Sequence, residues 1–183
     1  MREMEGSPMP APILIAYTTR GGSTREVAEA IGTTMREARL QVEVAPMRKV
    51  KSIGERGAVV LGAPLYMGGL PGDVARFLSR NRTALASQKV WFFVLGPIEG
   101  KADEFPAAGA QAEKYLAKFA WFKPAELRVF GGKFDVNHMP FPYSLARFLP
   151  AFPAKNMPAK DVRDWDAIRA WALDLAKQAG PAA

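Results

Sequence analysis

The sequence contains no cysteine and only one histidine, His138. The lack of thiols excludes disulfide bonds, thiolate zinc sites, iron–sulfur clusters and a cysteine nucleophile. A single imidazole excludes a histidine-rich metal site and a catalytic histidine pair. From the sequence we therefore assign neither a metal ligand nor a catalytic side chain.

Long apolar segments are lacking as well. The longest purely apolar run is Val90–Leu95, whereas a membrane-spanning helix needs about 20 residues. The N-terminus, MREMEGSPMPAP, mixes charges of both signs and lacks the apolar region of a secretory signal. We expect a cytoplasmic protein without a transmembrane span, in which residues 1–11 form a disordered leader.

The composition is that of a globular protein with a basic balance. The 183 residues, 49% of them hydrophobic, fit a single domain, expected over residues 12–180. Lys and Arg outnumber Asp and Glu by 25 to 18, which gives a formal net charge of +7. This excess favours phosphates, anionic lipid or nucleic acid as partners, and a solvated basic surface is the alternative.

Five short segments have the apolar or alternating pattern of strands. They are Ile13–Tyr17, Gln41–Pro46, Ala58–Ala63, Lys89–Leu95 and Glu126–Phe130. Only Met47–Gly57 separates the second strand from the third, which leaves room for a helix of one or two turns at most.

Helical patterns follow the other strands. In the first helix, Val27, Ile31 and Met35 recur every four residues and Ala38 closes the apolar stripe. The spacing of Ser23 and Glu26 predicts a capping box at its start. A second helix is expected to begin after Asp73, which is a plausible N-cap. Two more helices are expected, one over Ala107–Phe119 and one over about Asp164–Ala179.

Strands that alternate with helices predict a parallel sheet covered on both faces, an α/β three-layer sandwich with strand order 2-1-3-4-5. In such a sheet, ligands bind at the carboxyl ends of the strands, beside the point where the strand order reverses. The loops at this point are Thr18–Thr24 and Pro64–Gly72, with Gly96–Lys101 next to them.

The first of these loops, TTRGGST, joins the end of a strand to the start of a helix. Its four hydroxyls, two glycines and one arginine, together with the unpaired N–H groups of a helix start, favour an anion. They predict a phosphate site, and an ordinary capped turn is the alternative. The Walker string and the dinucleotide fingerprint GxGxxG are both absent at this turn. Ala16–Tyr17 and Ala63–Pro64 stand where a phospho-receiver domain needs acids, which excludes phosphoryl transfer to an aspartate.

A resemblance to flavodoxin-like proteins lies in YTTRGGSTREVAEAI, which is similar to their phosphate loop and first helix. Thr19, Gly22 and Thr24 match the family pattern. The second loop, VVLGAPLYMGG, resembles the loop that lies against the isoalloxazine ring in this family. The resemblance covers roughly residues 12–179, and it implies a flavodoxin-like fold with FMN as cofactor.

Within the family, the chain is most similar to the menaquinone-dependent protoporphyrinogen dehydrogenases. The segments that carry this similarity are TTRGGSTRE, LGAPLYMGG and DVRDWDAIRAWALDLA. The resemblance implies an FMN-dependent oxidoreductase of heme biosynthesis that passes electrons to a quinone. It also implies a quinone or porphyrinogen as substrate. We expect no nucleic acid as a partner, and a peripheral contact with the inner face of the membrane is the alternative to a purely cytoplasmic location.

The resemblance implies that three loops contact FMN. The phosphate-loop residues are Thr18, Thr19, Arg20, Gly21, Gly22, Ser23 and Thr24. The ring-loop residues are Pro64, Leu65, Tyr66, Met67, Gly68 and Gly69, and those of the third loop are Gly96, Pro97, Ile98 and Glu99. We expect Tyr66 or Met67 against a ring face and Glu99 near the pyrimidine edge, with a packed loop aromatic and a solvated acid as the alternatives.

The sequence departs from the dehydrogenase pattern in three places. Tyr66 and Met67 stand where that group has an arginine and an aromatic residue, and GPIEGKADEFP is shorter than its basic insertion and carries three acids. After the fifth strand, that group is basic and aromatic, whereas residues 131–158 are rich in proline and aromatics. We expect this excursion to form the substrate-side wall of the site, or alternatively to pack over the sheet edge.

Flavin chemistry is compatible with the lack of a catalytic cysteine, a metal site and a histidine-based dyad, because the cofactor carries the reaction. The positive net charge predicts a flavin potential above that of acidic flavodoxins. His138 is either a proton relay or an ordinary loop histidine. Two other functions remain open. One is an electron-transfer protein that docks with a redox partner protein and has no substrate of its own. The other is a non-enzymatic binding domain whose basic face meets nucleic acid or anionic membrane.

Overall fold

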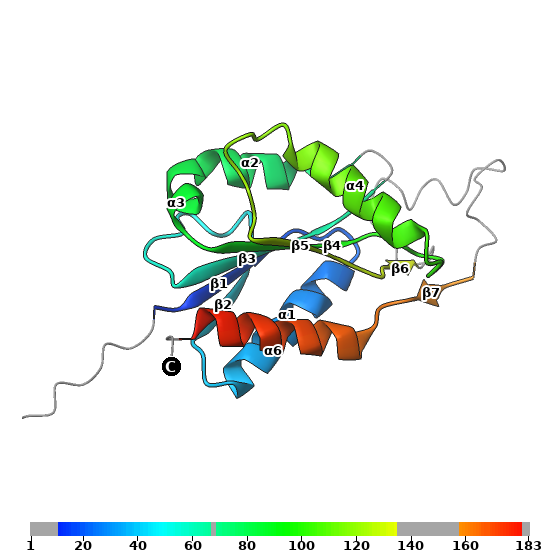
Figure 1. Cartoon of the computed structure of the whole chain (residues 1–183), viewed down its shortest axis with the longest axis horizontal. Helices are drawn as coiled ribbons and strands as arrows, with labels where there is room; N and C mark the ends of the chain where they lie inside the picture. The colour runs from blue at the N-terminus through cyan, green and yellow to red at the C-terminus, as the bar shows by residue number, and fades with distance from the viewer. Residues whose placement is uncertain (1–10, 67–68, 135–157, 181–183) are drawn as a thin grey trace, which may run out of the picture.

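The computed structural model describes residues 11–66, 69–134 and 158–180. Its centre is a five-stranded parallel sheet in the order β2-β1-β3-β4-β5 (Figure 1). The strands are β1 (Ile13–Tyr17), β2 (Val42–Pro46), β3 (Ala58–Pro64), β4 (Val90–Leu95) and β5 (Glu126–Phe130). The predicted strand order is confirmed, and each strand boundary lies within one residue of its predicted place.

Helices cover both faces of the sheet, which confirms the predicted three-layer α/β fold. On one face lie α1 (Ser23–Glu37) and α6 (Trp165–Ala179); on the other lie α2 (Gly72–Arg80), α3 (Arg82–Ser87) and α4 (Glu104–Leu116) (Figure 1). Strand side chains alternate between two cores, so that Phe93 packs with Trp171 under α6 while Phe92 packs with Phe122 on the opposite face. Both faces of the sheet are therefore buried.

The apolar stripe of α1 is confirmed, but its ends differ from the prediction. Val27, Ile31 and Met35 are fully buried, whereas Ala38 lies exposed just past the last turn. The capping box is wrong: Gly22 holds the N-cap position with a φ of 90°, and no side chain caps the helix. Glycine takes this place because other residues rarely adopt that conformation.

Three further helix predictions are corrected. Asp73 lies in the first turn of α2, behind Pro71 at the N-cap, and its side chain does not cap the helix. Helix α4 begins at Glu104, three residues ahead of the predicted Ala107, since a proline such as Pro106 is tolerated in a first turn. The crossover at residues 47–57 contains turns and no helix.

A short antiparallel ribbon follows the sheet. Its strands, β6 (Lys133–Phe134) and β7 (Lys160–Asp161), pair directly with each other. The ribbon is fastened to the loop after β4, because the Gly132 N–H donates to the Pro97 carbonyl at 2.6 Å. Residues 135–157, which include His138 and most of the expected substrate-side wall, lie outside the described residues, as do residues 1–10 of the expected leader.

Candidate functional site

The three predicted loops lie at the same edge of the sheet. Parallel pairing places Tyr17 beside Gly62, and Pro64 beside Leu95. The Thr18 N–H donates to the Gly62 carbonyl at 2.9 Å, and the Leu65 N–H donates to the Leu95 carbonyl at 2.7 Å. Because the strands end next to one another, the loops that follow β1, β3 and β4 face a shared space at the carboxyl edge.

The turn after β1 leads directly into α1. The Gly22 N–H donates to Thr19 Oγ1 at 2.9 Å, which closes the turn. Thr24, in the first turn of the helix, is fully buried, and its Oγ1 has no hydrogen-bond partner. A buried hydroxyl without a partner is unfavourable by about 1–3 kcal/mol. Beside the positive end of a helix, this hydroxyl fits an anionic ligand oxygen, and a phosphate in particular.

Not every hydroxyl of this loop is available to a ligand. Thr18 is buried, and its Oγ1 donates to Asp73 Oδ2 at 3.2 Å. Asp73 also accepts a hydrogen bond from Arg76 at 2.5 Å, and this bond is the main reason why the pKa of Asp73 lies below its ordinary value. Thr18 therefore ties the first loop to α2, and Asp73 serves this contact instead of capping the helix.

The second loop is a tight turn that carries an exposed aromatic ring. Backbone hydrogen bonds run in both directions between Tyr66 and Gly69, and Gln111 of α4 donates to the Tyr66 carbonyl at 2.9 Å. Tyr66 is 40% exposed. The Arg20 guanidinium carbon lies 5.4 Å from the centroid of the Tyr66 ring, so a cation–π contact joins the first and second loops. Met67 and Gly68 lie outside the described residues.

The third loop, residues 96–99, is held from both ends. The Gly96 N–H donates to the Phe130 carbonyl at 3.2 Å. At the other end, the Glu99 and Gly100 N–H groups donate to Glu104 at 3.3 and 3.0 Å. Glu99 forms an ion pair with Lys101, which lowers the pKa of Glu99. This contact favours the alternative interpretation of Glu99 as a solvated loop acid.

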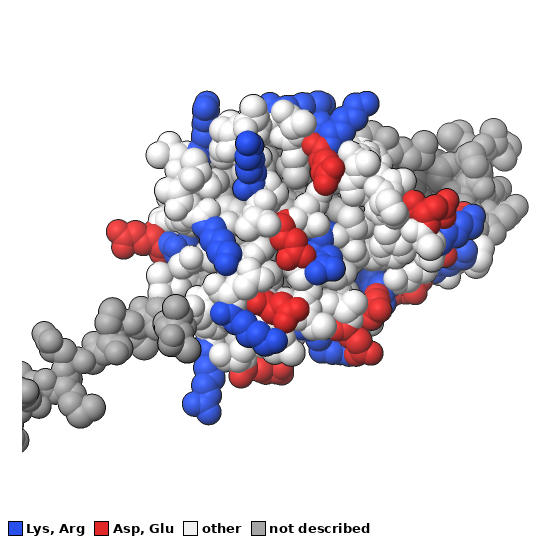
Figure 2. Space-filling view, in the orientation of Figure 1, with Lys and Arg blue, Asp and Glu red and all other residues white. Residues whose placement is uncertain are grey.

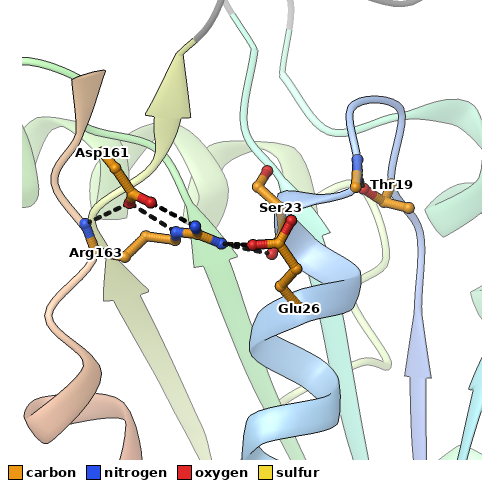
Figure 3. A network of polar contacts seen from close by, with 6 residues as sticks. Thr19, Ser23, Glu26, Asp161 and Arg163 are labelled. Carbon is orange, nitrogen blue, oxygen red and sulfur yellow. Dashed lines mark hydrogen bonds and ion pairs between the residues drawn. The ribbon is translucent and has the colours of Figure 1, made fainter. Parts of the chain in front are cut away.

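Arg163, a buried arginine beside the first loop, was not predicted from the sequence as a site residue. Only 3% of the Arg163 side chain is exposed. Arg163 binds Asp161 through two hydrogen bonds of 2.7 and 2.5 Å, and it donates to Glu26 of α1 at 2.8 Å (Figure 3). The hydrogen bond from Arg163 is the largest influence that lowers the pKa of Asp161. Glu26 thus pairs across 137 positions of the sequence and does not complete a capping box.

In the part of the chain that the structure describes, the basic residues do not gather into one block. On the face shown in Figure 2, Lys and Arg are interspersed with Asp and Glu. In the crossover, for example, Arg56 pairs with Glu43 at 2.6 Å. Within residues 11–66, 69–134 and 158–180, no helix is long and apolar enough to cross a membrane. The same residues contain no group of three or more acidic or histidine side chains that could hold a metal ion.

Comparison with known proteins agrees with this architecture. A flavodoxin from the domain Archaea superposes with a TM-score of 0.56 at 14% identity, over 92% of this chain and 98% of its own. A flavodoxin from Streptococcus pneumoniae TIGR4 superposes with a TM-score of 0.57 at 16% identity, over 92% of this chain and 99% of its own. At these identities the two structures establish the fold.

Sequence comparison identifies the family. The protoporphyrinogen IX dehydrogenase (quinone) of Escherichia coli strain K12 is 26% identical to this chain over 122 residues, which are 65% of this chain and 67% of that protein. The family model of the flavodoxin domain matches residues 14–142, which is more than half of the chain and supports FMN as the cofactor. The chain therefore belongs to the flavodoxin family.

Proposed function

We propose that this chain is an FMN-dependent oxidoreductase that takes electrons from an organic substrate of the porphyrinogen class and passes them to a quinone. The observation that carries the FMN site is the Thr24 hydroxyl, which is buried without a partner at the start of α1. The similarity to a protoporphyrinogen IX dehydrogenase (quinone) supports the substrate and acceptor classes.

In this proposal the first loop binds the phosphate. The Thr24 hydroxyl donates to a phosphate oxygen, while Thr19 keeps the turn closed through its bond with the Gly22 N–H. The backbone N–H groups of the first turn of α1 provide further donors, and the helix dipole favours the negative charge. Arg20 adds a positive charge at the rim, where it also contacts the Tyr66 ring.

The second and third loops hold the ring system. Tyr66 presents an exposed aromatic face, and the turn to Gly69 fixes its position. In this proposal the second and third loops lie along the polar edge of the ring. Bound FMN would supply the electron-accepting group, because this chain has no cysteine thiol that could do so. The protein binds the cofactor, orients it and limits its contact with water.

A flavodoxin-type electron-transfer protein without a substrate of its own is the second candidate. The near full-length superposition on two flavodoxins favours it. Such a protein exchanges electrons with a redox partner protein that docks at the exposed flavin edge, where Tyr66 presents its ring.

The two candidates are separated by turnover. The purified full-length chain is loaded with FMN, and its absorption spectrum is recorded before and after the addition. The loaded protein is then mixed with protoporphyrinogen and a menaquinone analogue, and porphyrin fluorescence is followed. Steady turnover above that of free FMN supports the oxidoreductase. A flavin spectrum without turnover supports the electron carrier, and the lack of any bound flavin refutes both.

A further inference from the structure

The first turn of α1 carries a carboxylate beside the proposed phosphate site. A Cβ atom built on Gly22 would lie 4.0 Å from Glu26 Oε1, so the carboxylate lies close to the turn that precedes the helix. An acid at this place interacts well with the helix dipole in the free protein. Toward a bound phosphate dianion, however, the same charge is repulsive.

Arg163 forms an ion pair with this carboxylate. Its Nη1 donates to Glu26 Oε2 at 2.8 Å and approaches the Ser23 carbonyl at 3.5 Å. Its remaining nitrogens bind Asp161, and its guanidinium carbon lies 4.6 Å from the centroid of Trp165. Figure 3 shows the guanidinium held between Asp161 and the first turn of α1. The arginine thus has a fixed position, and it fixes Glu26 in turn.

The charges in this network are nearly balanced. Arg163 faces two carboxylates, Asp161 and Glu26. Lys133, the β6 partner of Asp161 in the ribbon, adds a second positive charge, which also acts to lower the pKa of Asp161. With two cations and two anions, the network carries no net charge. Removal of one member leaves a net charge there.

We propose that Arg163 is a positioning residue for the FMN phosphate: it holds the Glu26 carboxylate beside the phosphate turn through an ion pair and compensates its charge, so that α1 accepts a dianion. This inference rests on the proposed FMN site. It assigns a binding role to a residue of the segment between the β6–β7 ribbon and α6, outside the three loops. It also makes Glu26 a residue that opposes cofactor binding.

A purely structural role of the network gives the opposite expectation for Glu26. If Arg163 and Glu26 only fasten α6 to α1, then removal of either partner loosens the turn and weakens flavin binding. If the charge account is correct, Glu26→Gln removes a repulsion and strengthens binding. The sign of the Glu26→Gln effect therefore separates the two roles. Glu26 is partly exposed, so this variant is expected to fold.

The test measures the dissociation constants of FMN and riboflavin for the flavin-free full-length chain. Riboflavin lacks the phosphate, so the ratio of the two constants isolates the phosphate contribution. We expect Glu26→Gln to tighten FMN by about threefold and to leave riboflavin unchanged. We expect Arg163→Gln to weaken FMN by about five- to tenfold, as for one charge at a helix end, and the double variant to return close to the wild type.

The matched control is Glu29→Gln, the same substitution at an exposed position one turn further along α1. Its effect on the ratio is expected to be clearly smaller. Equal weakening of FMN and riboflavin in Glu26→Gln, or an unchanged ratio, overturns the inference, and it does so whether or not Arg163→Gln folds. A wild-type chain that binds no flavin, or that binds both flavins equally, refutes the proposed FMN site itself.

Discussion

The orphaned hydroxyl of Thr24 gives the sharpest test of the cofactor site, because its removal should have opposite effects on stability and on binding. Thr24 is fully buried at the start of α1, and its Oγ1 has no hydrogen-bond partner. Valine has nearly the same shape and lacks the hydroxyl. Thr24→Val therefore removes an unsatisfied polar group without opening a cavity, and the two residues have similar helix propensities.

The magnitudes follow from the burial of this group. A buried polar group without a partner is unfavourable by about 1–3 kcal/mol. We expect Thr24→Val to raise the free energy of unfolding of the flavin-free protein by about 1 kcal/mol, which corresponds to about 2–4 °C in Tm for a domain of this size. A hydrogen bond to a charged group contributes about 1.5–3 kcal/mol. Its loss should weaken FMN by roughly tenfold to a hundredfold.

The assay combines thermal unfolding of the flavin-free protein with FMN titration followed by fluorescence quenching. Thr34→Val is the matched control, since Thr34 is also buried in α1 but lies nearly three turns beyond the phosphate loop. The control should leave FMN affinity unchanged. If Thr24→Val lowers the Tm, or if FMN binds the variant as tightly as the wild type, then the Thr24 hydroxyl does not bind the phosphate and the reasoning fails.

Three further predictions concern the turn, the acid response and the cofactor. Gly22→Val should weaken FMN strongly, because Gly22 has a φ of 90°; Gly54→Val, at a φ of 62° in an open crossover, should lower stability by about 1–2 kcal/mol and leave the FMN titration unchanged. The fold lowers the pKa of Asp73, so the ionised carboxylate contributes stability at pH values above the ordinary pKa of an aspartate, and this contribution is lost as the pH falls through the lowered pKa. Acid unfolding should therefore be less steep in Asp73→Asn, and an unchanged slope contradicts this. The net charge of +7 should place the potential of bound FMN above that of acidic flavodoxins, and spectroelectrochemistry at low and high salt tests this, since salt should shrink the difference.

The sheet could be predicted because its signal is local. Strands β1, β3 and β4 are buried along their whole length, and such strands appear in the sequence as unbroken apolar runs. The stripe of Val27, Ile31 and Met35 likewise reports the buried face of one helix. Alternation of such elements, with the handedness of parallel crossovers, leaves few possible strand orders. The positions of the three loops follow from that order.

Helix ends could not be predicted as well, because several residue types compete for each cap. Ser23 and Asp73 both have the chemistry of an N-cap, yet Gly22 and Pro71 occupy those positions. Asp73 is drawn to Thr18, which lies 55 positions away in the sequence. A capping motif considers only neighbouring residues, so a tertiary partner that offers a better hydrogen bond overrides it.

The same limit explains why the roles of Thr24 and Arg163 emerge only from the structure. Thr24 was among the predicted phosphate residues, but a sequence pattern does not distinguish it from Thr18, whose hydroxyl is already bound to Asp73. Arg163 lies outside every loop motif, and its contact with Glu26 arises because α6 packs beside α1. The loop sequence thus predicts where an anion binds. In our proposal, the contact between Arg163 and Glu26 determines how much negative charge the start of α1 presents to that anion.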